Sequence, residues 1–175
     1  VEDLRDKLFI LKNLVLKNID LEALEKIATE ETRTINIDKD EIEYPLYLSS
    51  LKDKHKGKVI AIARDRAFSF YYNDNIEFLE YMGFRITYFS PIKDKKVPDC
   101  DAIYLGGGYP ENFAEELSNN KEMIQSIREN YEQGKNILAE CGGFMYLSHA
   151  IEQKDETLHQ MCGLVPCTVV MNNRL

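Results

Sequence analysis

The sequence predicts a doubly wound α/β fold, a mostly parallel sheet wound with helices and preceded by a short helical segment. Apolar runs of strand length alternate with helical patterns from residue 58 onward, and this alternation favours parallel pairing. Three of the runs end in residues able to bind or react: Arg64-Asp65, the glycines 106–108 and Cys141. Ligands of such sheets bind beyond the carboxyl ends of the strands, so these residues are expected to lie near one site.

The residues ahead of the sheet divide into two parts. Residues 3–28 carry apolar side chains at helical spacing, which predicts one or two amphipathic helices with Asp20 as the N-cap of the second. Residues 29–56 are polar, rich in charge and interrupted by Pro45, so a linker is expected in which 46–51 pack locally. We place the domain boundaries at 1–45 and 57–175.

Four apolar runs predict the strands of the sheet. Strands are expected at 58–65, 84–90, 101–108 and 136–141. Between and after them, helices are expected at 75–82, 121–133 and 143–151, the first two ended by glycines. The last residues, 159–175, resemble the start of a β-rich segment, and we expect the sheet to be truncated at Leu175.

Composition excludes several classes of function. A net charge of −8 argues against a nucleic acid partner. No apolar stretch approaches the ~18 residues that cross a bilayer, so no membrane partner is expected. Four cysteines in 175 residues make neither a disulfide framework nor a zinc site. A cytoplasmic protein is the expectation, and association into a homodimer is left open.

Cys141 has the strongest chemical context. A strand, a cysteine, two glycines and a helix form a nucleophile elbow with sulfur in place of the usual hydroxyl. Gly142 allows close approach of a substrate, and its N–H can face a developing oxyanion. A helix N-terminus favours thiolate over thiol. A buried structural cysteine is the alternative, and the glycines favour a catalytic nucleophile.

The glycines of LGGGYPEN (105–112) are a second element. Their spacing matches no phosphate-binding loop. Acyl transfer needs a second oxyanion donor, so Gly107 and Gly108 are expected to supply backbone N–H groups for the oxyanion or for the substrate. An ordinary strand-to-helix turn is the alternative. The roles of Glu111, Arg64 and Asp65 stay open, the last two as a salt bridge or as part of the site.

A catalytic cysteine needs a general base. His55 falls in the linker, His149 falls eight residues after the cysteine on the same expected helix, and His159 falls in a polar stretch. None is placed to reach the sulfur. The base is therefore expected beyond Leu175, and the fragment alone is expected to be a poor catalyst.

Together, GGGYPE (106–111) and AECGGFMYL (139–147) resemble the class I, triad-type glutamine amidotransferase domain of the cobyrinic acid synthases. ARDRAFSFYYNDN (63–75) resembles their a,c-diamide synthase branch. The resemblance covers roughly 57–171 and implies a flavodoxin-like domain with Cys141 as nucleophile and the N–H groups of Gly108 and Gly142 as oxyanion hole.

The same resemblance implies a two-domain enzyme. An upstream synthetase domain would bind ATP and Mg²⁺ and activate carboxylates of a corrinoid precursor, cobyrinic acid, while the amidotransferase domain hydrolyses L-glutamine to ammonia. No P-loop and no HxFHYS-like segment with the family's histidine occurs in this chain, so no cofactor is expected on it. Residues 1–40 resemble the last helices of the synthetase domain.

Three alternatives remain at this stage. The parent enzyme can act instead on nickel-sirohydrochlorin, because the absent domain chooses the acceptor. A flavodoxin-like cysteine hydrolase would carry its base within the chain. A non-catalytic interaction module would retain Cys141 without using it.

Overall fold

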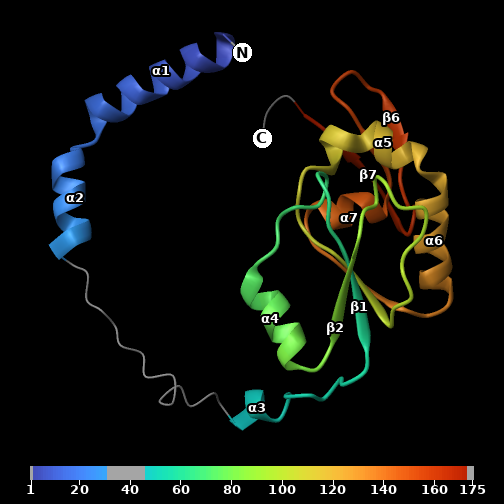
Figure 1. The fold of residues 1–175 in the computed structure, drawn as a ribbon. Helices are drawn as coiled ribbons and strands as arrows, with labels where there is room; N and C mark the ends of the chain where they lie inside the picture. Colours follow the sequence, from blue (N-terminus) through green and yellow to red (C-terminus); the bar gives the residue numbers. More distant parts are fainter. Residues whose placement is uncertain (1, 31–45, 173–175) are drawn as a thin grey trace. The chain divides into compact units, whose positions relative to one another are not determined.

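The computed structural model describes residues 2–30 and 46–172, which belong to two units, Val1–Glu43 and Tyr44–Leu175 (Figure 1). The first unit contains α1 (Glu2–Asn18) and α2 (Leu21–Glu30). Asp20 caps α2, its carboxylate accepting a hydrogen bond from Ala23 N at 3.0 Å. The two helices and the cap are confirmed. No helix in the described ranges is long and apolar enough to cross a membrane.

The second unit begins with α3 (Leu46–Ser49) and a series of turns that lead to the first strand. The local packing expected for 46–51 is therefore present as a short helix. Most of the expected linker, 31–45, lies outside the described residues. Further along, His55 stacks on Phe84 with ring centroids 4.5 Å apart, so it lies where strands begin rather than where they end.

The central sheet has four parallel strands in the order β2-β1-β3-β4. They are β1 (Val59–Ala63), β2 (Arg85–Phe89), β3 (Ala102–Leu105) and β4 (Asn136–Ala139). All four expected strands are confirmed, each shorter than its apolar run. β1 is buried along its whole length, as a central parallel strand requires.

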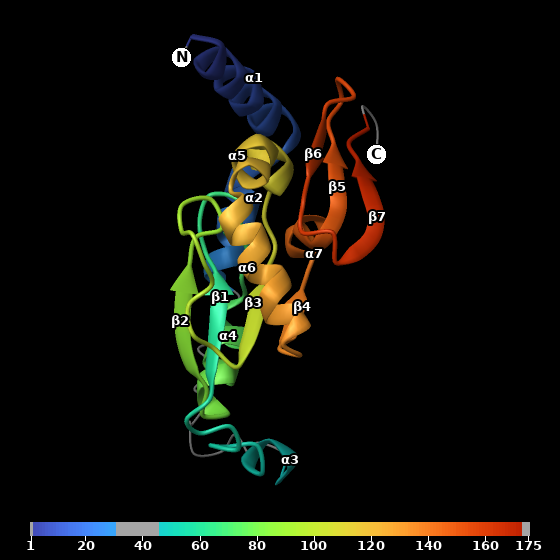
Figure 2. The same ribbon diagram turned by 90° about the vertical axis from the view of Figure 1, so that its right-hand side faces the viewer.

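Helices cover both faces of this sheet (Figures 1 and 2). On one face, α4 (Asn73–Tyr81) packs over Ile60, Ile62 and Tyr104. On the other face lie η1 (Pro110–Phe113), α5 (Ala114–Asn119), α6 (Lys121–Glu132) and α7 (Gly142–Leu147), over the larger core. The doubly wound fold is confirmed, and because its strands are parallel, all four end at the same carboxyl edge.

A second sheet follows α7 and corrects one prediction. The helix expected over 143–151 ends at Leu147, and β5 (Ser148–Glu152) begins directly after it. β5 pairs with β6 (Leu158–Gln160) and with β7 (Val165–Val170), which confirms the expected β-rich segment (Figure 2). Ser148 adopts an extended backbone and donates to Met145 O at 2.7 Å, so helical geometry stops there.

Candidate active site

Cys141 lies between the end of β4 and the start of α7, at the carboxyl edge of the sheet. Its backbone has φ 47° and ψ −108°, a region that non-glycine residues rarely adopt outside sharp turns. The residue is solvent-exposed. This strained turn presents a side chain above the sheet edge, which is the geometry expected of a nucleophile elbow.

The two glycines after Cys141 allow the turn to sit close to the neighbouring strand. Gly143 N–H donates to Gly106 O at 2.9 Å and to Glu140 O at 2.8 Å. A Cβ atom on Gly143 would overlap the carbonyl oxygen of Leu105. A Cβ on Gly142 would lie 2.8 Å from Pro110 Cδ. Both positions exclude a side chain because the backbone of β3 and its loop lies against them.

The glycine loop after β3 is held by the loop that follows β1. Gly107 and Phe70 exchange both of their backbone hydrogen bonds, at 3.1 and 3.0 Å, and Tyr109 N–H donates to Ala67 O at 3.0 Å. The intervening N–H, on Gly108, has no acceptor among the described residues. A Cβ on Gly142 would lie 3.1 Å from this nitrogen, so the Gly108 and Gly142 segments are adjacent.

Two of the three glycine N–H groups proposed from the sequence therefore remain available. Within the described chain, the N–H groups of Gly108 and Gly142 have no acceptor, whereas the N–H of Gly107 is engaged with Phe70. Gly142 is the first residue of α7, where an N–H has no intrahelical partner. The arrangement offers two unpaired donors beside an exposed thiol.

Two tyrosines lie beneath the elbow. Tyr71 OH donates to Ala63 O at the end of β1 and accepts from Gly106 N–H at 3.0 Å. Burial raises the pKa of Tyr71 to about 12, so the hydroxyl keeps its proton at neutral pH. Tyr104 OH donates to the Glu140 carboxylate at 2.5 Å. These contacts tie three strand ends together next to Cys141, and nothing in the local sequence pattern indicated them.

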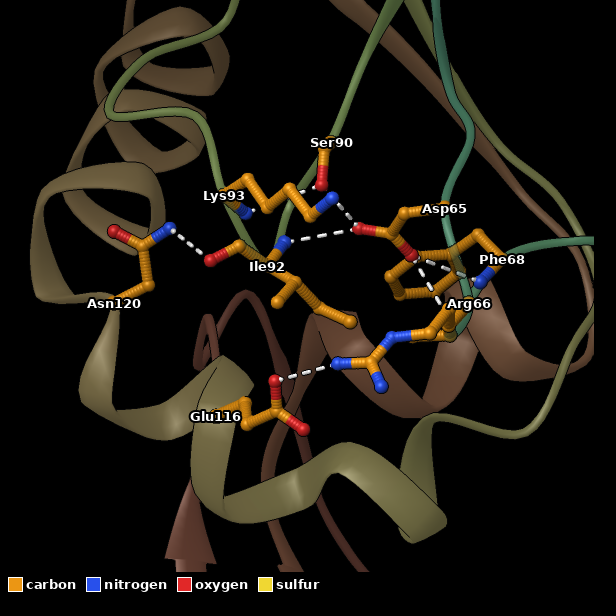
Figure 3. Close-up of polar contacts among 9 residues, drawn as sticks. Asp65, Arg66, Phe68, Ser90, Ile92, Lys93, Glu116 and Asn120 are labelled. Atoms are coloured by element: carbon orange, nitrogen blue, oxygen red, sulfur yellow. Dashed lines mark hydrogen bonds and ion pairs between the residues drawn. The ribbon is translucent and has the colours of Figure 1, made fainter.

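The carboxylate of Asp65 accepts four hydrogen bonds (Figure 3). One carboxylate oxygen accepts from Ala67 N at 2.8 Å and Phe68 N at 3.2 Å. The other accepts from Ser90 Oγ at 2.8 Å and Ile92 N at 2.9 Å. Asp65 therefore joins the loop after β1 to the loop after β2.

The Arg64–Asp65 salt bridge allowed by the sequence is absent from the ion pairs of the described chain. Arg64 instead lies over the Tyr88 ring, 5.1 Å from its centroid. Glu111 accepts a hydrogen bond at its carbonyl oxygen from Gln153 Nε2 at 2.5 Å, which ties η1 to the end of β5.

The three histidines are not positioned to act as a base for Cys141. His55 stacks on Phe84, and His159 lies on β6. His149 lies on β5 and not on the nucleophile's helix, because that helix ends at Leu147. No hydrogen bond joins a histidine to Cys141 in the ranges that the structure describes. Nor do those ranges contain a group of three His, Cys, Asp or Glu able to hold a metal ion.

The other cysteines lie in different surroundings. Cys162 is fully buried, and burial raises the pKa of its thiol to about 12. Burial also raises the pKa of Cys100. Cys167 is half-buried on β7. Cys141 is the exposed thiol of the four, and all four are free.

Comparison with known proteins identifies the family. Residues 59–175 match the model of the CobB/CobQ-like glutamine amidotransferase domain. A cobyrinate a,c-diamide synthase of Fusobacterium nucleatum is 76% identical over 175 residues, which are all of this chain and 39% of the relative. A synthase of the same name from Clostridium tetani is 49% identical over 156 residues, covering 89% of this chain and 32% of the relative.

A third relative, the cobyrinate a,c-diamide synthase of Methanocaldococcus jannaschii, is 40% identical over 177 residues, covering 100% of this chain and 35% of the relative. The chain thus spans about a third to two fifths of the length of these curated relatives. A solved Listeria monocytogenes EGD-e protein described as a candidate peptidase E has a TM-score of 0.50 at 16% identity, covering 68% of each chain. At that identity it supports the fold alone.

Proposed function

The chain belongs to the CobB/CobQ-like glutamine amidotransferase family, and we propose that it is the glutamine-hydrolysing part of a cobyrinate a,c-diamide synthase. The observation that carries the proposal is the exposed Cys141 thiol on a strained strand-to-helix turn, beside the unpaired N–H groups of Gly108 and Gly142. A nucleophile and two oxyanion donors are what acyl transfer from a carboxamide requires.

The chemistry proceeds in two steps. The Cys141 thiolate attacks the side-chain amide carbon of L-glutamine, and the carbonyl oxygen becomes an oxyanion that accepts hydrogen bonds from Gly108 and Gly142. The C–N bond then breaks, and ammonia leaves with an added proton. Water attacks the resulting γ-glutamyl thioester and releases glutamate and the thiol. The sum is glutamine plus water giving glutamate plus ammonia.

Proton transfer needs a group that the described residues do not place beside Cys141. The leaving ammonia takes up a proton and the hydrolytic water loses one, which is work for a single general acid–base. We propose that a histidine elsewhere in the full protein performs it. Gly107, whose N–H is engaged, would then shape the glutamine site through its loop rather than donate to the oxyanion.

The ammonia would serve a synthesis on another part of the protein. We propose that a synthetase domain outside this chain binds ATP and Mg²⁺ and activates carboxylates of cobyrinic acid, which ammonia then converts to amides. The names of relatives up to 76% identical favour cobyrinate over nickel-sirohydrochlorin as acceptor. We propose the cytoplasm as the location of the protein, because its four free cysteines are compatible with a reducing compartment.

The first unit fits this arrangement as the end of that synthetase domain. Its two helices expose apolar side chains that a neighbouring domain would cover. Those more than half exposed are Leu4, Leu8, Phe9, Ile10, Leu11, Leu14, Leu16, Leu24 and Ile27. The family model begins only at residue 59, which leaves both helices outside the amidotransferase domain.

The test is the exchange of Cys141 for alanine in the full-length protein. Cys141→Ala is expected to abolish amide synthesis from glutamine and to leave synthesis from free ammonia unchanged, because only the first needs the nucleophile. Cys167→Ala, at a half-buried thiol on β7, is the matched control and should leave both rates unchanged. Equal loss with glutamine and ammonia in Cys141→Ala would give Cys141 a structural role and overturn the proposal.

A further inference from the structure

We infer that Asp65 is a positioning residue for the oxyanion hole: it fixes the loop that holds the Gly108 N–H beside Cys141. The inference rests on the proposed function, since it concerns the same site. Asp65 itself follows the end of β1. Its carboxylate accepts hydrogen bonds from three backbone N–H groups and from the Ser90 hydroxyl. Its effect on the site is transmitted through the loop 65–70.

The first step is the conformation of that loop. Asp65 accepts hydrogen bonds from Ala67 N–H and Phe68 N–H, which closes a tight turn, and its own N–H donates to Phe68 O at 3.2 Å. The second carboxylate oxygen anchors this turn to Ser90 and Ile92 after β2 (Figure 3). Residues 65–68 are thus held from both sides by one side chain.

The second step is the contact of the loop with the glycines. Ala67 O accepts the N–H of Tyr109, and Phe70 pairs in both directions with Gly107. These bonds engage the N–H groups on either side of Gly108 and leave the one between them free. A Cβ on Gly108 would overlap Ala67 O, so the two segments are in direct contact. A shift of Ala67 would move Gly108.

The third step is the contact with the nucleophile's helix. The Phe68 ring is fully buried and packs on Tyr146 of α7, with ring centroids 5.5 Å apart. The loop that Asp65 closes therefore contacts both the Gly108 segment and the helix that starts at Gly142. Both proposed donors depend on it, and a misplacement of about 1 Å in a catalytic group can cost about 10²-fold in rate.

A carboxylate is needed because all four partners of Asp65 are donors. An asparagine has one acceptor oxygen and one NH₂ group. In Asp65→Asn, the NH₂ would face either Ala67 N–H and Phe68 N–H or the donors Ser90 OH and Ile92 N–H. Facing the turn, the NH₂ loses the bonds from Ala67 and Phe68, and facing the other way it loses the bond from Ile92, because the Ser90 hydroxyl can also accept. In either orientation at least one anchor is lost while side-chain size is kept, so the turn loosens without a change in volume.

The experiment compares two reactions of Cys141 in the full-length protein. Acylation by the γ-p-nitrophenyl ester of L-glutamate releases p-nitrophenolate, passes through an oxyanion and needs no proton for the leaving group. Alkylation by iodoacetamide displaces iodide at a saturated carbon and forms no oxyanion. The ratio of the two rate constants therefore reports the oxyanion hole separately from the amount of folded protein and of reactive thiol.

Asp65→Asn is expected to lower acylation by about 10–100-fold while alkylation changes by less than about twofold. Ser90→Ala removes one of the four bonds and should give a smaller loss in the same ratio, which keeps the test usable if Asp65→Asn does not fold. Asp101→Asn is the matched control. Asp101 also bonds a backbone N–H, Val59 N at 2.8 Å, but at the amino edge of the sheet, so its ratio should stay unchanged.

An unchanged ratio in Asp65→Asn, or the same loss in Asp101→Asn, would overturn the inference. If the unmodified protein is not acylated at Cys141 at all, the proposed function itself fails. These two failures are distinguished by the first measurement on the unmodified protein.

Discussion

The two edges of the central sheet use glycine for different physical reasons. At the amino edge, Gly57 precedes β1 and Gly134 precedes β4, with φ of +87° and +80°. No atom lies within 4 Å of a Cβ built on either residue. These glycines are required by a left-handed backbone conformation at a turn, and the space around them is open.

At the carboxyl edge the glycines are required by contact. A Cβ on Gly106 would overlap the Tyr71 ring, one on Gly108 would overlap Ala67 O, and one on Gly143 would overlap Leu105 O. Here three loops from different strands lie against one another. Cys141 is the non-glycine residue with a positive φ at this edge, and the turn presents its side chain. The amino edge has one crowded glycine as well, Gly83 before β2, where a Cβ would lie 2.9 Å from Lys56 N. What distinguishes the site is therefore the gathering of several crowded glycines where the loops after different strands meet.

The largest expected difference between the edges is in stability. Gly143→Ala places a methyl group on a backbone oxygen that cannot move without breaking β3, so we expect a loss above ~3 kcal/mol in the free energy of unfolding. In Gly134→Ala the added methyl group meets open space. The expected loss in the free energy of unfolding is therefore only the cost of a left-handed backbone at alanine, ~1–2 kcal/mol. Urea denaturation of both variants, in the full-length protein, measures the difference. Equal losses would contradict the distinction between the two edges.

A smaller effect, confined to catalysis, is expected at Gly142. Its added methyl group would meet Pro110 Cδ at 2.8 Å and Gly108 N at 3.1 Å. Gly142→Ala should therefore push the two donor segments apart and lower glutaminase kcat/KM by about 10–100-fold. Gly134→Ala is the control and should keep the full rate. A normal rate in Gly142→Ala would remove the Gly108 N–H from the oxyanion hole.

The smallest expected effect concerns Tyr71, which bridges β1 and the glycine loop. Tyr71→Phe leaves Gly106 N–H and Ala63 O without this partner, at a cost of ~1–3 kcal/mol in the free energy of unfolding. Tyr72→Phe removes a hydroxyl from a side chain that is 62% exposed and should change nothing. Denaturant unfolding of the pair measures the contrast. Indistinguishable midpoints would show that the bridge does not stabilise the carboxyl edge.

Periodicity was sufficient to predict the parallel sheet, because each strand and helix of this fold carries its own local pattern. It failed at 148–151. There the helix-like run becomes β5, since pairing with 165–170 buries Ala150 and Ile151 completely. Whether 148–151 form a helix or a strand is decided by pairing with residues far along the chain, so a local pattern cannot predict it.

The site was partly predictable for the same reason. Cys141 and its glycines are contiguous, so their pattern indicated an elbow directly. Whether Gly107 or Gly108 keeps a free N–H depends on pairing with Phe70, more than thirty residues earlier. The role of Asp65 depends on Ser90 and Ile92, from the loop after another strand. Interactions between loops decide these roles, and only the folded chain brings the loops together.

The central claim is that the crowded carboxyl edge presents Cys141 to glutamine. The direct measurement is incubation of the full-length protein with 6-diazo-5-oxo-L-norleucine, an electrophilic glutamine analogue, followed by mass spectrometry of the digested chain. We expect one adduct, on Cys141, whose formation is slowed by glutamine, with buried Cys162 unmodified because its thiol is inaccessible and its pKa is raised to about 12. An adduct on Cys100, Cys162 or Cys167 instead, or labelling of Cys141 that glutamine does not slow, would contradict the account.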